Sequence, residues 1–105
     1  MKPNPKLFAD ARGIWSEQEP GRPSGIEWKD IYRITGYKLD GITTTFTCVV
    51  MDFDYGEFIE LYHHWPGFDQ VIAAITERMP GISPEWFHKV EQRCVADPTI
   101  EIWHR

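Results

Sequence analysis

Cysteine is scarce in this chain of 105 residues, and the two that occur, Cys48 and Cys94, stand far from any CxxC spacing. We expect Cys48 in a strand and Cys94 in a helix, both on apolar faces. This placement favours buried, reduced thiols over a disulfide or a catalytic nucleophile, because free cysteine usually behaves as a small hydrophobe.

Long apolar runs are also missing. No stretch approaches the roughly 18 to 20 apolar residues of a membrane span, and the first residues, MKPNPKLFADARG, lack the apolar segment of a secretory signal. A cytoplasmic location is expected. The 16 acidic side chains outnumber the 11 basic ones and give a formal charge of -5, which repels phosphate backbones and anionic lipid. We therefore expect neither nucleic acid nor a membrane surface as a partner.

The common catalytic motifs are absent too, because the chain has no nucleophile elbow, P-loop or dinucleotide-binding fingerprint. The segment from Asp52 to His63 begins like a calcium loop but lacks the final glutamate. His63 and His64 are adjacent, and neighbouring residues of a strand point to opposite faces, so we expect no shared metal ion. The stretch ELYHHWPGF is interpreted as a joint, and no cofactor is expected.

Aromatic and apolar residues are abundant, at 14% and 42% of the chain, and five of them are tryptophan. This content is sufficient for one packed core, so we expect a single domain over residues 1–105. Residues 1–6, with two prolines, are expected to form an arm that is disordered. Two prolines and two glycines predict an exposed loop over residues 19–25.

Several strands are expected. Residues 7–15 are weakly apolar and form a candidate first strand, and after a bend at Trp28 a second strand runs over residues 31–39. Asp40-Gly41 predicts a two-residue hairpin that pairs residue 39 with 42, 37 with 44 and 35 with 46. In the next strand, residues 42–53, the expected core side carries Ile42, Phe46, Cys48 and Val50, and the threonines 43, 45 and 47 face outward.

A second hairpin is expected at residues 54–56, followed by a strand over residues 57–65. Apolar residues at helical spacing, from Phe68 to Met79, predict a first helix, and Ser83-Pro84 predicts the start of a second. Residues 99–103 alternate as a closing strand. The expected fold is therefore α+β: an antiparallel sheet of about four to five strands, with two consecutive helices on one face and a C-terminal closing strand.

The aromatic residues exceed what one face of a small sheet can bury, so some must lie on the second face. The N-terminal segment covers that face, or it is an interaction surface or a homodimer contact. The leading hypothesis is a non-catalytic protein-binding or accessory module with an acidic, aromatic surface formed by Asp52, Asp54, Tyr55, Glu57, Phe58, Glu60, Tyr62 and His64. The alternative is a small-ligand binder or enzyme that uses His63, His64 and nearby carboxylates in a cleft between sheet and helices.

Five segments carry a resemblance: Ile26–Ile31, Gly36–Asp40, Pro66–Phe68, Trp86 and Thr99–Arg105. Over about four fifths of its length the chain resembles a group of short, uncharacterised bacterial proteins with a single α+β domain. Some of these are similar to pleckstrin-homology-like sheets or to immunity proteins against bacterial toxins. The resemblance implies a bacterial source and transfers no catalytic residue. It is consistent with a basic protein such as a toxin as partner, since charge complementarity accelerates association. A pleckstrin-homology fold would place its long helix last, and the expected closing strand departs from that pattern.

Overall fold

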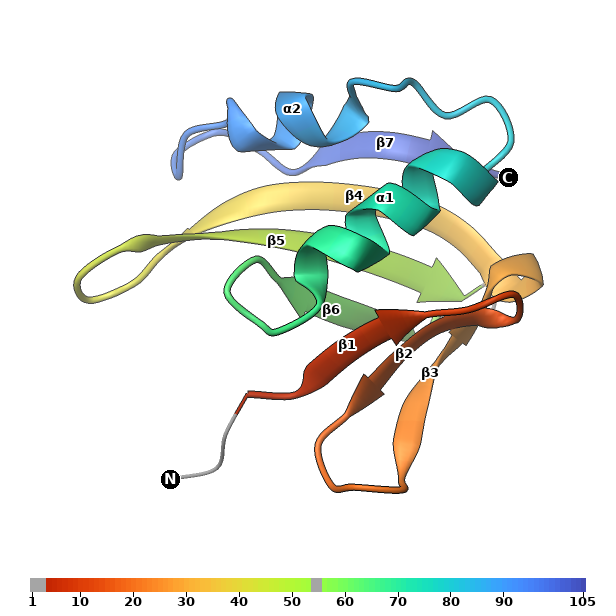
Figure 1. The fold of residues 1–105 in the computed structure, drawn as a ribbon. Helices are drawn as coiled ribbons and strands as arrows, with labels where there is room; N and C mark the ends of the chain where they lie inside the picture. The colour runs from red at the N-terminus through yellow and green to blue at the C-terminus, as the bar shows by residue number, and fades with distance from the viewer. Residues whose placement is uncertain (1–3, 54–55) are drawn as a thin grey trace.

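Two antiparallel sheets and two short helices make up the described residues, 4–53 and 56–105, of this computed structural model (Figure 1). One sheet has the order β1-β2-β3 and the other the order β6-β5-β4-β7. In chain order the elements are β1 (Lys6–Ala9), β2 (Gly13–Glu17), β3 (Pro23–Glu27), the 3-10 turn η1 (Trp28–Asp30), β4 (Ile31–Asp40), β5 (Thr45–Phe53), β6 (Phe58–Tyr62), α1 (Phe68–Arg78), α2 (Trp86–Glu91) and β7 (Ile100–His104).

The α+β class is confirmed, but the expected single sheet of four to five strands is wrong. Seven strands in the described residues divide between a three-stranded and a four-stranded sheet. The division occurs at η1, which turns the chain between β3 and β4 and so confirms the bend expected at Trp28. Because of this turn, Ile26 and Ile31 lie in different sheets although both are fully buried.

Residues 7–15, expected to form one strand, belong to two strands, β1 and β2, because Asp10 forms a tight turn between them. Its carboxylate accepts hydrogen bonds from the backbone N–H groups of Arg12 and Gly13 and from the indole of Trp15. The bond from the Trp15 indole contributes most to lowering the pKa of Asp10. An aspartate that bonds to its own backbone in this way favours a turn over a continuous strand.

The ends of this segment differ from the predictions in detail. Of the loop expected over residues 19–25, residues 19–22 lie between β2 and β3, whereas Pro23 already pairs with Glu17 in the sheet. Lys6, expected in the disordered arm, is the first residue of β1 and pairs with Glu17. Residues 1–3 of that arm lie outside the described residues.

The two-residue hairpin at Asp40-Gly41 is wrong. Asp40 pairs with Thr45, and the Gly41 amide donates to the carbonyl of Thr44, so residues 41–44 form the loop. Leu39 therefore faces Phe46 instead of Ile42. The ring of Phe46 packs so closely on Gly41 that a side chain there would clash with it. A loop of four residues thus replaces the two-residue turn that Asp-Gly favours.

The expected core side of β5 is also wrong. Val49 and Met51 are fully buried against the helices and the N-terminal sheet, whereas Ile42 is completely exposed and Phe46 and Val50 are only half-buried. Thr47, expected to face outward, is buried on the same side as Val49, where it accepts a hydrogen bond from the Lys38 ammonium. Thr45 and Thr47 lie on the same side of β5 as Val49 and Met51, which follow them. These larger apolar residues determine that this side is the buried one.

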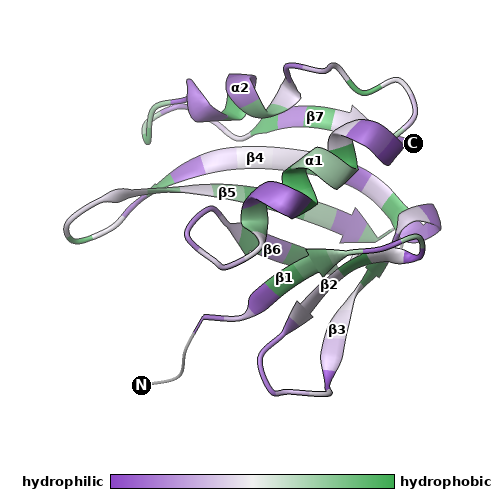
Figure 2. Ribbon diagram, in the orientation of Figure 1, coloured by the Kyte–Doolittle hydropathy of each residue, from purple (hydrophilic) through white to green (hydrophobic). Residues whose placement is uncertain are grey.

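Both helices and the closing strand are confirmed, with small shifts in their ends. The stripe predicted for α1 is buried at Phe68, Val71 and Ile75, and Figure 2 shows apolar and hydrophilic residues alternating along this helix. The second helix begins at Trp86, later than the predicted cap at Ser83. Cys94 lies beyond the end of α2 and is exposed, so its expected burial on a helix face is wrong.

The stretch ELYHHWPGF is a joint between the four-stranded sheet, α1 and the N-terminal sheet. Strand β6 ends at Tyr62, a turn follows, and α1 begins at Phe68. Gly67 adopts a φ of 88°, which favours glycine, and an added Cβ would lie 1.9 Å from the carbonyl oxygen of Leu7. The Leu7 amide in turn donates to the carbonyl of Pro66 at 2.7 Å.

One continuous core lies inside these layers. Leu7, Ile14 and Ile26 of the N-terminal sheet belong to the same buried cluster as Val49 and Leu61 of the four-stranded sheet. Helix α2 packs onto β4 at Gly36, where the methyl groups of Val90 fill the space that a side chain would need. The helices and the N-terminal sheet therefore cover the same face of the four-stranded sheet, which we call its inner face.

Candidate functional site

The outer face of the four-stranded sheet is the first candidate site. It is the face opposite the core, and strand pairing places on it Arg33, Thr35, Tyr37, Leu39, Phe46, Cys48, Val50, Asp52, Phe58, Glu60, Tyr62 and Glu101. The N-terminal sheet does not cover this face, because its apolar residues belong to the core on the opposite side. The side chains of Leu39 and Phe58 remain 43% and 56% exposed.

Four of the predicted interaction residues lie on this face: Asp52, Phe58, Glu60 and Tyr62. Asp52 accepts a hydrogen bond from Arg33 at 2.8 Å, and this bond contributes most to raising the pKa of the Arg33 guanidinium. Glu60 accepts a hydrogen bond from the Tyr62 hydroxyl at 2.6 Å. The remaining described members of the predicted set, Glu57 and His64, are both exposed. The predicted residues Asp54 and Tyr55 lie outside the described residues.

A buried thiol lies at the centre of the outer face. Cys48 pairs with Tyr37 on one side and with Tyr62 on the other. Burial raises the pKa of the Cys48 thiol to about 11, and burial also raises the pKa of Tyr37. The hydrogen bond to Glu60, followed by burial, raises the pKa of Tyr62 to about 12. At neutral pH these groups are therefore uncharged and act as hydrogen-bonding and packing groups.

The two histidines do not alternate across a strand, and the geometric basis for separating them was wrong. Both lie in the turn after β6, with their ring centroids 5.8 Å apart. The Nδ1 atom of His63 accepts a hydrogen bond from the Thr47 amide at 2.9 Å, and His64 packs on the ring of Phe46. Across residues 4–53 and 56–105, no group of three or more histidine, cysteine or carboxylate side chains is arranged to hold a metal ion.

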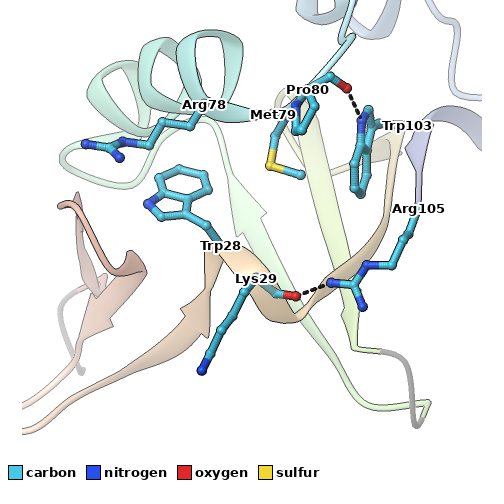
Figure 3. A pocket seen from close by; sticks show the side chains of 7 residues that line it. All are labelled: Trp28, Lys29, Arg78, Met79, Pro80, Trp103 and Arg105. Carbon is cyan, nitrogen blue, oxygen red and sulfur yellow. Dashed lines mark hydrogen bonds between the residues drawn. The ribbon is translucent and has the colours of Figure 1, made fainter.

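A second candidate site lies on the helix side of the four-stranded sheet, where three segments that are far apart in the sequence meet (Figure 3). A hollow of about 450 Å³, which we call the Trp28–Trp103 pocket, is lined by residues of η1, of the end of α1 and of the end of β7: Trp28, Lys29, Arg78, Met79, Pro80, Trp103 and Arg105. Its volume falls within the range typical of small-molecule sites. Neither His63 nor His64 lines it.

Four hydrogen bonds position the walls of the Trp28–Trp103 pocket. The Trp28 indole donates to the carbonyl of Asp10 at 2.8 Å, and the Trp103 indole donates to the carbonyl of Pro80 at 2.8 Å. The Arg105 guanidinium donates to the carbonyl of Lys29, and its amide donates to that of Tyr32. Both indole N–H groups are thus used for support, which leaves the ring surfaces to line the hollow.

The charged side chains that line this pocket are all basic. Lys29, Arg78 and Arg105 are exposed, and the Arg78 guanidinium lies 5.7 Å from the centre of the Trp28 ring, in cation–π geometry. The ion pairs formed by the described residues join Arg12 to Glu27 and Arg33 to Asp52, so none of the three cations has a carboxylate partner there. In an acidic protein this local excess of positive charge is unusual.

Sequence reasoning missed this pocket. It placed Trp28 at a bend and Trp103 in the closing strand, and no motif joins these two residues, which lie 75 positions apart in the sequence. Aromatic and basic residues adjoin at Trp28-Lys29 and at Trp103-His104-Arg105, but they also adjoin at Tyr32-Arg33 and Tyr37-Lys38, so this signal does not single out the pocket.

Comparisons with protein-family models, with curated proteins and with solved structures find no match to this chain. The site must therefore be interpreted from its own geometry.

The longest helix, α1, has 11 residues, and within the described residues no helix has the length and apolar character needed to cross a membrane.

Proposed function

We propose that this chain is a small, non-catalytic binding module that engages a basic protein through the outer face of its four-stranded sheet. The observation that carries the proposal is that this face, with aromatic side chains on neighbouring strands, has no covering layer among the described residues. Aromatic residues are enriched in protein interfaces because they bury a large area at low cost in side-chain entropy.

The charge on the outer face favours a basic partner. Arg33 and Asp52 neutralise each other at 2.8 Å, whereas Glu60 and Glu101 have no cation within ion-pair distance in the described part of the chain. A basic surface, such as that of a nuclease toxin, would meet this acidic excess with complementary charge, which raises the association rate. An immunity-like role follows from that pairing.

The chemistry of the face supports binding more than catalysis. A catalytic thiol has to be ionised near neutral pH, and burial raises the pKa of Cys48 to about 11. The Glu60 carboxylate is held by the Tyr62 hydroxyl, and Asp52 by Arg33. These groups already have partners and none is activated for attack on a substrate.

The proposal is tested by affinity capture with matched variants. The outer-face variant combines Leu39→Ala with Phe58→Ala, two exposed side chains whose removal leaves the core intact. The control variant is Val95→Ala, which removes a comparably exposed apolar side chain after α2. Protein recovered by the wild type and the control is identified by mass spectrometry, and its affinity is measured with purified components at two salt concentrations.

A basic protein that binds the wild type and the control, and that binds the outer-face variant at least tenfold more weakly, supports the proposal. Equal binding to the outer-face variant contradicts it. Self-association that the outer-face variant abolishes in sedimentation experiments also contradicts it, because the occupant is then a second copy of this chain. Affinity that does not fall with added salt contradicts the assignment of a basic partner.

A further inference from the structure

The Trp28–Trp103 pocket lies on the helix side of the four-stranded sheet and is separate from the outer face. We propose that it binds a small organic anion whose flat apolar part packs against the two indole rings and whose acidic group is held by Arg105. Arg78 contributes positive charge from the far side of Trp28. This site is independent of the protein partner proposed for the outer face.

The walls of the pocket favour a flat apolar body. Trp28 and Trp103 are half-buried, and Figure 3 shows both rings bordering the same hollow, with Met79 and Pro80 between them. Ring surfaces and a thioether make favourable contacts with flat, polarisable groups. Because both indole N–H groups already donate to backbone carbonyls, the rings offer no free donor and make apolar contacts with a ligand.

The acidic group is assigned to Arg105 because of how its guanidinium is held. One of its nitrogens donates to the carbonyl of Lys29, and a guanidinium has five N–H donors, so further donors stay available beside the hollow. Arginine binds carboxylates and phosphates through two parallel hydrogen bonds. The Lys29 side chain extends away from the hollow in Figure 3, so its ammonium is not assigned to the ligand.

Arg78 strengthens the site in a different way. Its guanidinium is packed over the Trp28 ring at 5.7 Å from the centroid, which holds a positive charge on the side of that ring away from Met79 and Trp103 (Figure 3). No aspartate or glutamate is among the residues that line the pocket, and none of its basic side chains is paired with one within the described residues. An anion that enters therefore gains attraction without displacing an existing ion pair, and such an attraction weakens as salt is added.

Carboxylates and phosphates share this chemistry, so the experiment has two arms. The carboxylate arm compares indole-3-acetate with its neutral amide, and the phosphate arm compares adenosine monophosphate with adenosine. Binding is followed by two-dimensional NMR of the indole N–H groups. We expect an anion of at least one arm to shift the signals of Trp28 and Trp103, and to leave that of Trp86, which bonds to Thr76 away from the pocket, unchanged.

The variants separate the acidic group from the apolar walls. Arg105→Gln is expected to weaken binding of the anion about tenfold or more, since it removes a charge-assisted hydrogen bond. Arg78→Gln is expected to weaken it severalfold and keeps the test valid if Arg105→Gln alters the end of β7. Arg22→Gln, at an exposed position between β2 and β3, removes the same charge elsewhere and is expected to have no effect.

Three outcomes would overturn the inference. The first is that neither anion shifts the two pocket indoles at millimolar concentration. The second is that the neutral analogues bind as well as the anions, which would make the pocket merely apolar. The third is that Arg105→Gln and Arg78→Gln both bind like the wild type. Failure of the protein-binding proposal leaves these outcomes unaffected, because none of these residues belongs to the outer face.

Discussion

The two faces of the four-stranded sheet share the same strands but differ in what covers them. On the inner face Val49, Met51 and Leu61 are at most 1% exposed beneath the helices and the N-terminal sheet. On the outer face the neighbouring Val50 is half-buried and Phe58 is 56% exposed. Two adjacent valines of β5 thus occupy very different environments, although their side chains are identical.

The comparison shows that aromatic content alone does not identify the core. The inner face of this sheet is packed largely by aliphatic residues and contains Gly36, which makes room for Val90. The outer face carries tyrosine and phenylalanine together with carboxylates. Aliphatic side chains interlock tightly around a helix, whereas tyrosine keeps a polar group that can remain in water. The aromatic residues of the outer face, Tyr37, Phe46, Phe58 and Tyr62, therefore keep part of their surface exposed.

The largest loss of stability is expected from a change in the joint before α1, which connects the four-stranded sheet to the helix that covers its inner face. We expect Gly67→Ala to reduce the free energy of unfolding by about 3 kcal/mol or more, because it adds a left-handed backbone penalty to a clash with the Leu7 carbonyl. Urea unfolding measures the loss. The control is Gly21→Ala, which has a similar φ of 81° and open space around it, so its cost should be about 1 kcal/mol. Equal losses would show that the contact with β1 contributes nothing.

An intermediate effect is expected from the pair of adjacent valines in β5. Val49→Ala should cost about 2 kcal/mol, because it leaves a cavity in a packed core, whereas Val50→Ala should cost about 0.5 kcal/mol. Thermal and urea unfolding of both variants gives the difference directly. A larger loss for Val50→Ala would mean that the outer face is covered and that the assignment of the two faces is reversed.

The smallest effect is expected at alkaline pH, on the outer face. The Cys48 thiol ionises near its ordinary pKa of 9.0 in the unfolded chain and at about 11 in the folded one. The unfolded chain therefore loses its proton first as the pH rises. The protonated Cys48 thiol makes its full contribution to the free energy of unfolding below pH 9. This contribution falls by about 1 to 2 kcal/mol as the pH rises through 11. Tyr62, raised from 10.0 to about 12, acts in the same direction at higher pH.

Stability measured between pH 8 and 11 tests this expectation. Cys48→Ala should flatten the decline that begins near pH 9, whereas Cys94→Ala, at an exposed position, should leave it unchanged. In the native protein at neutral pH, iodoacetamide should label Cys94 and leave Cys48 unmodified. Rapid labelling of Cys48 would show that its environment is open and would remove the reason for its raised pKa.

Local patterns predicted the elements with regular periodicity. The apolar stripe of α1 and the alternation of β7 were sufficient to place both elements within a few residues. The number of sheets was not accessible in this way, because the bend predicted at Trp28 does not by itself show that the strands on its two sides belong to different sheets. The two-residue hairpin after Asp40 was wrong because Asp-Gly permits a short turn without requiring one, and the pairing of Asp40 with Thr45 leaves residues 41–44 as the loop.

The two candidate sites differ in how much of them the sequence could predict. Most residues of the outer face come from a single hairpin, so Phe58, Glu60 and Tyr62 were grouped correctly before their face was known. The Trp28–Trp103 pocket joins η1, the end of α1 and the end of β7, and each contributes two or three residues. A site divided in this way has no spacing that sequence reasoning can recognise.

By itself the sequence determined the α+β class, the two helices, the joint at Pro66-Gly67 and the closing strand, because each depends on residues within a few positions of one another. The tertiary structure alone decided that there are two sheets, which side of β5 is covered, and that Trp28 meets Trp103. These features depend on which segments pack together, and that choice is made by the burial of all apolar surfaces at once, which no single stretch of the chain encodes.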